Sequence, residues 1–442
     1  MSEDVTLDEF KQNEQRSESK PEWQKTKLED LLSELLTGGR PTGGGLDEGE
    51  YISIGGTQIN SEGYIDLQDL VYIPEEYFDQ VEETQLQKHD ILVVKDGANT
   101  GDVAIAWQSD DQIVTNEHLF TLRTDSSINP PYLFYYLLSH QGWKQINGTI
   151  TGSAQEGINR GFTGKVDIKY PSISEQRKIA TVLYTLDRAI EKTEEITEQA
   201  HTVKNALMQD VFHGRHKSFE DYQSTPVGEI PTHWSVVSIG DVVHTAQYGI
   251  SESLSEEGQY PIFRMNNIEN GKMVDEPLKY IDLDNDEFEK YRVECGDILF
   301  NRTNSLDLVG KTGIYELEGD HVFASYLVRL KTNSRADSHY LNYYMNSSEA
   351  QNRMMDFATK GVSQANINAN SIQQVKLPLP PVEEQKEIAD RLSSIDSQIE
   401  ANDQYMSQLK RLKRGLMQDL LSGKVRTTDT NIEVPEEVAQ HG

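Results

Sequence analysis

Two groups of polar side chains have the hydrogen-bonding types that recognise nucleic acid bases. Arginine pairs with guanine, asparagine and glutamine pair with adenine, and lysine neutralises phosphate groups. The first group is Lys95, Asn99, Thr100, Gln155, Asn159 and Arg160. The second group is Arg302, Asn304, Ser305, Ser363, Gln364 and Asn366. The lysines expected to contact phosphates are Lys144, Lys165, Lys311 and Lys360.

Each of these side chains also has an interpretation that involves no contact with a base. Any one of them could belong to a solvated surface loop, and Gln155, Gln364, Asn159 and Asn368 could instead hold a turn through side-chain hydrogen bonds. The prediction of base contacts therefore depends on the groups lying at equivalent places in the chain.

A different chemistry is suggested by Asn129-Pro130-Pro131-Tyr132, which matches the active-site tetrapeptide of amino-methyltransferases. Such enzymes need a glycine-rich turn for S-adenosylmethionine, and neither F-x-G-x-G nor G-x-G-x-x-G precedes this stretch. The prolines also suit the first turn of a helix, where a missing N–H costs nothing. We expect a helix start and no catalytic residue, with methyl transfer by Asn129 and Tyr132 as the alternative.

An internal repeat with a spacing of about 209 residues organises the chain. Residues 174–214 and 383–423 align without a gap and are identical at 15 of 41 positions. Upstream, PYLFYYLLS at 131–139 matches HYLNYYMNS at 339–347, and HDILVVKDG at 89–97 matches GDILFNRTN at 296–304. The two polar groups lie at equivalent points of this repeat, which favours a shared role.

The repeated helical segments carry an apolar seam in steps of four and three residues, the pattern of a coiled coil. Lys204 and Lys413 occupy the same interior step of the two seams, where they can fix the register. Since both seams lie in one chain, we expect an antiparallel intramolecular pair in place of a homodimer zipper. The seam residues are Ile179, Leu183, Leu186, Ile190, Leu207, Ile388, Leu392, Ile395, Ile399, Leu409 and Leu416.

Composition limits the classes of protein. The 442 residues are 36% hydrophobic and 26% charged, and no apolar run reaches the roughly 20 residues of a membrane span. The amino terminus lacks the basic segment followed by an apolar segment that marks a secretory signal, so we expect a cytoplasmic protein. Cys295 is the only cysteine, and the 11 histidines show no metal-site spacing, so neither a disulfide nor a metal site is expected.

The repeat predicts an α+β fold in which two similar globular domains, each a mixed sheet with helices, are joined by two long antiparallel helices with pseudo-twofold symmetry. The expected parts are an acidic flexible tail (1–22), a first recognition domain (23–170), a first coiled-coil helix (171–214), a linker (215–230), a second recognition domain (231–380), a second coiled-coil helix (381–423) and a C-terminal tail (424–442).

The segments YPSISEQRKIATVL and LPLPPVEEQKEIADRL, each placed after a strand such as GDILF and a YLxYYxxS helix, resemble specificity subunits of type I restriction-modification enzymes. The resemblance covers about residues 23–426. It implies that two target-recognition domains each recognise half of a bipartite DNA sequence, that the helices set the gap, and that two methyltransferase subunits and restriction subunits dock on the helices. It also implies no catalysis by this chain, so S-adenosylmethionine, ATP and magnesium would bind to the partners.

The charge is unusual for a chain that contacts DNA. The 41 Lys and Arg residues stand against 73 Asp and Glu residues, a net charge of −32. A halophilic, archaeal host would explain this balance, because repulsion at about 1 M salt is screened within about 3 Å. Two other functions stay open: a recognition subunit of a methylation-only or related defence system, and a coiled-coil scaffold that binds proteins.

Overall fold

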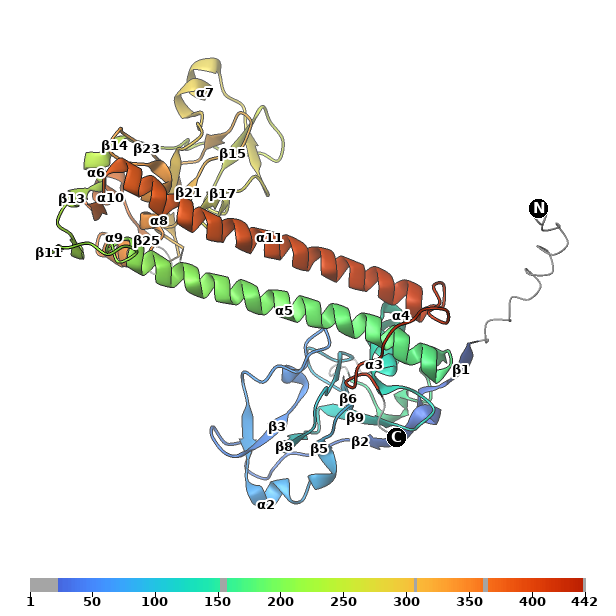
Figure 1. Ribbon diagram of the computed structural model, residues 1–442. Helices are drawn as coiled ribbons and strands as arrows, with labels where there is room; N and C mark the ends of the chain where they lie inside the picture. The colour runs from blue at the N-terminus through green and yellow to red at the C-terminus, as the bar shows by residue number, and fades with distance from the viewer. Residues whose placement is uncertain (1–22, 152–156, 306–307, 361–364, 440–442) are drawn as a thin grey trace, which may run out of the picture. The chain divides into compact units, whose positions relative to one another are not determined.

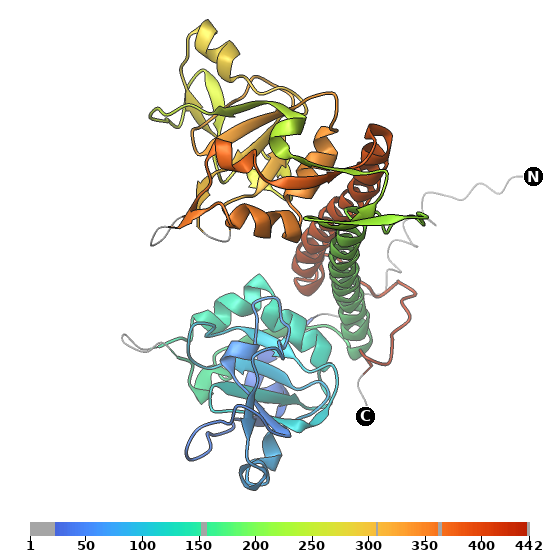
Figure 2. The same cartoon turned by 90° about the vertical axis from the view of Figure 1, so that its left-hand side faces the viewer.

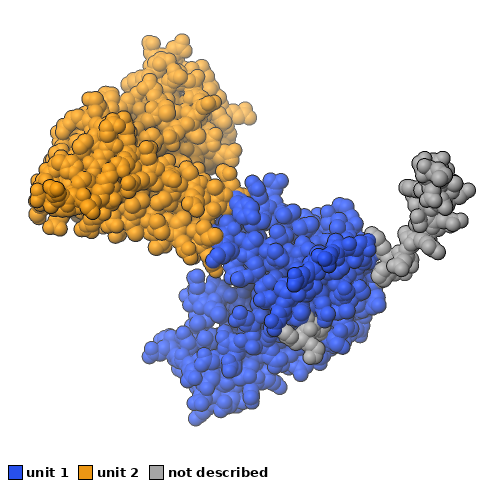
Figure 3. Space-filling view, viewed as in Figure 1, with its two compact units in different colours: residues 1–193, 405–442 blue, residues 194–404 orange. Residues whose placement is uncertain are grey.

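The computed structural model describes residues 23–151, 157–305, 308–360 and 365–439 (Figure 1). These divide into two compact units, shown in different colours in Figure 3. Unit 1 contains residues 1–193 and 405–442, and unit 2 contains residues 194–404.

Two long helices, α5 (Ile173–Val211) and α11 (Val382–Leu421), correspond to the repeated helical segments. Each unit contains a stretch of both helices. Within each unit the two stretches lie side by side and run in opposite directions (Figures 1 and 2). Gly214 and Gly423 follow the helices with φ values of 71° and 77°, the left-handed conformation of a helix C-terminal cap. The predicted antiparallel pair is therefore confirmed.

The apolar seam does more than join the two helices. Ile179 and Leu183 belong to the main core of unit 1, where they pack with Tyr132 and other domain residues. Ile388 and Leu392 take the same part in the core of unit 2. All other predicted seam residues are buried or half-buried: Leu186, Ile190, Leu207, Ile395, Ile399, Leu409 and Leu416.

Unit 1 contains two four-stranded sheets. The first has the strand order β2-β9-β6-β7 and is antiparallel throughout. The second has the order β4-β3-β8-β5, with β3 and β8 parallel. The strands are β2 (Leu32–Leu36), β3 (Tyr51–Ile54), β4 (Val71–Ile73), β5 (Gln85–Leu86), β6 (Ile91–Val94), β7 (Val103–Ile105), β8 (Asp110–Thr115) and β9 (Leu119–Thr124).

Unit 2 contains the corresponding sheets. Its six-stranded sheet has the order β14-β23-β19-β21-β17-β16, and its three-stranded sheet has the order β18-β15-β22, with β15 and β22 parallel. The strands are β14 (Val243–Tyr248), β15 (Tyr260–Phe263), β16 (Ile268–Glu269), β17 (Lys272–Met273), β18 (Lys279–Ile281), β19 (Ile298–Asn301), β21 (Thr312–Ile314), β22 (Val322–Phe323) and β23 (Leu327–Thr332). The shared strand orders confirm two similar α+β domains.

Each domain is tied to its long helix by the same short elements. A two-stranded sheet pairs β1 (Gln24–Lys27) with β10 (Asp167–Tyr170) in unit 1, and β13 (Ser235–Ser238) with β26 (Lys376–Leu379) in unit 2. Two consecutive helices precede the second strand of this sheet in both repeats. They are α3 (Pro130–Leu138) and α4 (His140–Asn147) in unit 1, and α8 (Ser338–Met345) and α9 (Ser348–Met355) in unit 2.

Both units also contain shorter α-helices. They are α2 (Glu75–Phe78), α6 (Ile239–Val242), α7 (Asn285–Tyr291) and α10 (Ala369–Ile372). The linker forms a hairpin of β11 (Tyr222–Thr225) and β12 (Gly228–Pro231). The segment after α11 packs on unit 1, with Val438 fully buried in its core.

Candidate nucleic-acid interface

In unit 1 the two halves of the predicted polar group meet. The loop after β6 carries Lys95, and the amide of Ile158 donates to the Lys95 carbonyl oxygen at 2.8 Å. The adjacent Asp96 and Gly157 form a β-bridge. This backbone pairing places Asn159 beside a strand end that lies more than 60 residues earlier in the sequence.

In unit 2 the same pairing occurs at the equivalent positions. The amide of Ile367 donates to the carbonyl oxygen of Arg302 at 2.9 Å. Strand β20 (Thr303–Asn304) pairs with β25 (Ala365–Asn366), which also pairs with β24 (Thr359–Lys360). The two polar groups are thus each assembled from two distant segments in the same way.

Two polar side chains in the loop after β6 form hydrogen bonds within the domain. Asn99 donates its amide to the carbonyl oxygens of Gly56 and Ile59 at 3.1 and 3.0 Å. The Thr100 hydroxyl donates to the Gly97 carbonyl oxygen at 2.6 Å. These bonds fix the loop, and they leave the Asn99 side-chain oxygen as an acceptor.

The second segment of unit 1 fits the turn-holding alternative at one position. Asn159 is exposed and accepts a hydrogen bond from the Gly161 amide at 3.0 Å, and its repeat partner Asn368 caps α10 in the same manner. Arg160 is exposed and donates to the Leu35 carbonyl oxygen at 2.5 Å. Asn159 therefore has a structural use whether or not it contacts a base.

Neighbouring residues hold the Arg302 side chain in unit 2, but they use only some of its hydrogen-bond donors. Its guanidinium carbon lies 4.9 Å from the centre of the Tyr248 ring, and Nη1 donates to the Ser325 carbonyl oxygen at 3.0 Å. Stacking and a fixed donor orient a planar fork, which suits bidentate contact with guanine. Asn366 donates to the Thr303 hydroxyl at 2.7 Å.

The remaining predicted residues lie at separate places in the two units. Lys144 on α4, Lys165 and Lys311 are exposed, as phosphate contacts require. Asn304 accepts from the amide of Ser305 at 2.8 Å, so the two stabilise their own turn. Lys360 ends β24, and its side chain lies outside the described part of the structure, as do Gln155, Ser363 and Gln364.

Two exposed tyrosines beside Arg302 are absent from the sequence-based prediction. Tyr248 is 42% exposed and Tyr326 is 47% exposed, and the Tyr326 carbonyl oxygen accepts from the Arg302 amide at 3.0 Å. Aromatic faces next to an arginine suit stacking on bases. Tyr248 is the last residue of β14 and Tyr326 directly precedes β23, and this strand-end position is the signal that could have identified them.

Unit 1 has a hollow of about 650 Å³ beside the loop after β6. Its lining includes Arg40, whose Nε lies 2.9 Å from Glu117 Oε1, and His118, which is paired with Asp96. The glycine-rich segment around Arg40 forms one wall. These side chains are a second feature that the sequence-based prediction missed, because the partners of Arg40, Glu117 and His118, are distant from it in the sequence.

Asn129 of the Asn-Pro-Pro-Tyr stretch is completely buried. Its side-chain oxygen caps α3 by accepting from the Tyr132 amide at 3.1 Å, and its side-chain nitrogen donates to the Val438 carbonyl oxygen at 2.9 Å. Tyr132 is also fully buried, and its hydroxyl donates to the Lys169 carbonyl oxygen. These contacts are those of a helix start.

Within the described ranges, no group of three or more His, Cys, Asp or Glu side chains is placed to hold a metal ion. None of the helices in the described part of the chain is both long enough and apolar enough to cross a membrane.

Comparison with known proteins agrees with the duplicated architecture. The type I restriction modification DNA specificity domain matches residues 20–201 and again residues 231–411. A putative type I restriction enzyme MjaX specificity subunit of Methanocaldococcus jannaschii is 32% identical over 46% of this chain, a match that spans 49% of that relative. The EcoKI specificity subunit of Escherichia coli is 23% identical over 82% of this chain and 79% of its own length.

Solved structures share the fold. The type I restriction-modification S subunit from M. genitalium superposes with a TM-score of 0.58 at 14% identity, covering 92% of this chain and 97% of that one. A chain from a structural study of assembly and conformational transition of the type I R-M system has a TM-score of 0.52 at 18% identity and covers 92% of this chain and 99% of that one. With two matched specificity domains spanning most of its length, the chain belongs to the family of type I restriction-modification DNA specificity subunits.

Proposed function

We propose that this chain recognises a bipartite DNA sequence, with one half-site read by each recognition domain, and that it performs no catalysis itself. One observation carries the proposal. In both units, backbone pairing joins the same two distant segments, which places Lys95 beside Asn159 in unit 1 and Arg302 beside Asn366 in unit 2. The side chains differ between the units, so the two half-sites should differ in sequence.

We further propose that the long helices dock two methyltransferase subunits and restriction subunits. Several large apolar side chains on these helices are exposed, including Val203, Tyr405 and Leu412. Tyr405 and Leu412 are seven residues apart on α11 and so lie on one face of that helix. Exposed apolar side chains on one helix face support a contact with a protein partner. The partners would supply S-adenosylmethionine, ATP and magnesium, and the complex would act on DNA in the cytoplasm.

The test combines the purified chain with the methyltransferase subunit encoded beside it, at high KCl and with S-adenosylmethionine. Adenine methylation is then mapped across genomic DNA by single-molecule sequencing. A split motif with two short halves and a fixed gap is the expected result. A well-formed complex that methylates nothing would contradict the proposal. Methylation without the partner would show that the chain itself catalyses methyl transfer.

A further inference from the structure

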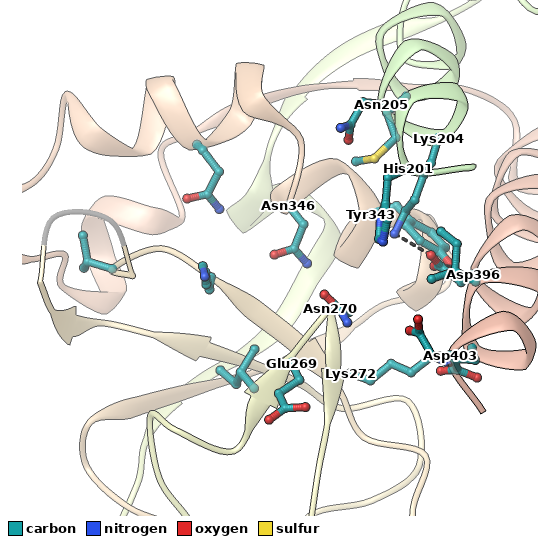
Figure 4. Close-up of a pocket in the computed structure, with 18 of the residues that line it drawn as sticks. His201, Lys204, Asn205, Glu269, Asn270, Lys272, Tyr343, Asn346, Asp396 and Asp403 are labelled. Atoms are coloured by element: carbon teal, nitrogen blue, oxygen red, sulfur yellow. Dashed lines mark hydrogen bonds and ion pairs between the residues drawn. The ribbon is translucent and has the colours of Figure 1, made fainter. Parts of the chain in front are cut away.

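Unit 2 buries a tyrosine, an aspartate and a lysine in direct contact. The Tyr343 hydroxyl donates to Asp396 Oδ2 at 2.7 Å, and Lys204 Nζ lies 2.5 Å from Asp396 Oδ1 (Figure 4). Lys204 Nζ also lies 5.7 Å from the centre of the Tyr343 ring. Asp396 is only 8% exposed, so the lysine and the tyrosine replace the water that a carboxylate requires.

Unit 1 contains the same arrangement at the equivalent residues. The Tyr135 hydroxyl donates to Asp187 Oδ2 at 2.7 Å, and Lys413 Nζ lies 2.5 Å from Asp187 Oδ1 and 5.8 Å from the Tyr135 ring centre. Burial, followed by the charge of Asp187, raises the pKa of Tyr135 well above its usual value, so this hydroxyl stays a donor.

Each of these triads joins three elements. In unit 2 the tyrosine comes from α8 of the recognition domain, the aspartate from α11, which follows that domain, and the lysine from α5 of the other repeat. In unit 1 the corresponding elements are α3, α5 and α11. The lysine is therefore always the contribution of the opposite repeat.

The spacing of the charges selects one arrangement of the helices. Asp187 and Lys204 are 17 residues apart on α5, and Asp396 and Lys413 are 17 residues apart on α11. In the antiparallel register of this structure, each aspartate meets a lysine. A parallel pair would place aspartate near aspartate and lysine near lysine, and a shifted antiparallel pair would leave two carboxylates buried without a cation.

All three residues of the unit 2 triad line a cavity, whereas Asp187 is the one member of the unit 1 triad that does so. A cavity of about 740 Å³ in unit 2 is lined by Lys204, Tyr343 and Asp396 together with the β16–β17 hairpin (Figure 4). In unit 1, Tyr64 reaches Asp187, and burial followed by the Asp187 charge raises the pKa of its hydroxyl. Lys204 therefore has open space beside it, which a substituted side chain can occupy.

We propose that Lys204 and Lys413 are positioning residues, which hold each recognition domain to the long helix of the other repeat and so fix the gap between the two half-sites. This inference rests on the proposed function. A slip of one heptad would move the helices about 10 Å relative to each other, at 1.5 Å per residue. Since DNA rises about 3.4 Å per base pair, such a slip corresponds to about three base pairs of gap.

The experiment uses the complex of the full chain with its methyltransferase subunit. The substrates are duplexes that carry the two half-sites recovered from methylation mapping, with gaps from four base pairs shorter to four longer than the natural one. The Lys204→Met, Lys413→Met double variant removes both cations while keeping side-chain length. Lys386→Met, an exposed lysine on α11, is the matched control, and the Lys204→Arg, Lys413→Arg double variant keeps both charges.

We expect the methionine variant to lose gap discrimination while keeping both half-site sequences. Its preference for the natural gap over other gaps should fall about tenfold, equivalent to about 1.4 kcal/mol. Lys386→Met should retain the preference, and the arginine variant should recover most of it. If the methionine variant does not fold, the Tyr135→Phe, Tyr343→Phe variant, which loses only two hydroxyls, should show the same change to a smaller degree.

Two outcomes separate the inference from its premise. A folded methionine or phenylalanine variant that discriminates gaps as sharply as the wild type would overturn the positioning role. A wild-type complex that methylates no bipartite sequence would instead refute the proposed function.

Discussion

The side-chain amide of Asn129 donates a hydrogen bond at 2.9 Å to the carbonyl oxygen of Val438, which is 309 residues away in the sequence. Both residues are completely buried. The segment that follows α11 is therefore part of the core of unit 1, and a residue from a catalytic-looking tetrapeptide holds it there. Lys178 adds contacts to the same segment, since its ammonium donates to the carbonyl oxygens of Thr427 and Thr430.

Replacing Asn129 with alanine should destabilise unit 1 without affecting methyl transfer. The substitution removes a helix cap, worth about 0.5–2 kcal/mol, and leaves the buried Val438 carbonyl oxygen unpaired, at a cost of about 1–3 kcal/mol. Asp337, which caps α8 at the equivalent position, supplies the matched control, and Asp337→Ala should cost only the cap. Urea unfolding measures both variants. Methyl transfer by the isolated wild-type chain that disappears in Asn129→Ala would contradict this view.

A charge placed at Val438 should destabilise unit 1 more strongly. Val438→Asp puts an unpaired carboxylate into the apolar core, and such a change costs about 3–5 kcal/mol. Asn431→Asp adds the same charge at an exposed position of the same segment and should be nearly neutral. Thermal unfolding and limited proteolysis compare the two. Equal stability of the variants would mean that the segment does not pack on unit 1 in solution.

The sequence predicted the architecture well because the repeat and the apolar seam are local patterns. Lys204 and Lys413 stood out as charged residues at interior seam steps. Their partners could not be predicted in the same way. Asp187 and Asp396 directly follow the seam positions Leu186 and Ile395, and a step pattern does not show that the neighbouring position is also buried.

The candidate site was predictable only as two groups of residue types. The strand that ends near Lys95 and the turn that contains Asn159 are joined by long-range backbone pairing, which no local pattern encodes. The roles of individual side chains depend on neighbours that are distant in sequence, such as Tyr248 beneath Arg302. The packing of Val438 was likewise hidden, because a single apolar residue in a polar tail has no periodic signal.

Replacing Arg302 with alanine should relax recognition at one base position in the second half-site. Loss of a bidentate contact to guanine costs about 1–3 kcal/mol of discrimination. Lys311→Ala, in the same unit, should instead weaken binding evenly across sequences and reduce the salt slope by about one. Methylation mapping and fluorescence anisotropy at several KCl concentrations separate the two effects. A motif unchanged in both halves for Arg302→Ala would exclude Arg302 from base recognition.

The stability of unit 2 should fall as the pH drops below about 6.5, partly through His321. Its ring stacks on the Phe263 ring with 4.8 Å between the ring centres, and its Nδ1 lies 2.9 Å from the Tyr315 hydroxyl oxygen. Burial lowers the pKa of His321 below its usual value of 6.5, despite the opposing charges of Asp275 and Asp320. The unfolded chain then binds more protons between the two pKa values, so acid favours unfolding in that window.

The variant His321→Phe isolates this contribution, because it keeps an aromatic ring and removes the titrating group. Urea unfolding between pH 5 and 8 should give a weaker dependence on pH for the variant than for the wild type. His216, whose pKa burial also lowers, stays in both proteins and cancels from the comparison. Parallel pH profiles for the two proteins would show that His321 does not titrate as its surroundings predict.

Potassium chloride should stabilise this chain up to molar concentrations. The net charge of −32 means that the excess carboxylates repel one another in the folded state. Salt near 1 M screens this repulsion beyond about 3 Å. Short ion pairs that are shielded from solvent, such as Lys413 with Asp187, should persist because buried pairs are screened much less. We therefore expect the melting temperature to rise by several degrees between 0.1 and 2 M KCl. A melting temperature that falls steadily above about 1 M would argue against adaptation to high salt and would leave the acidic surface without that explanation.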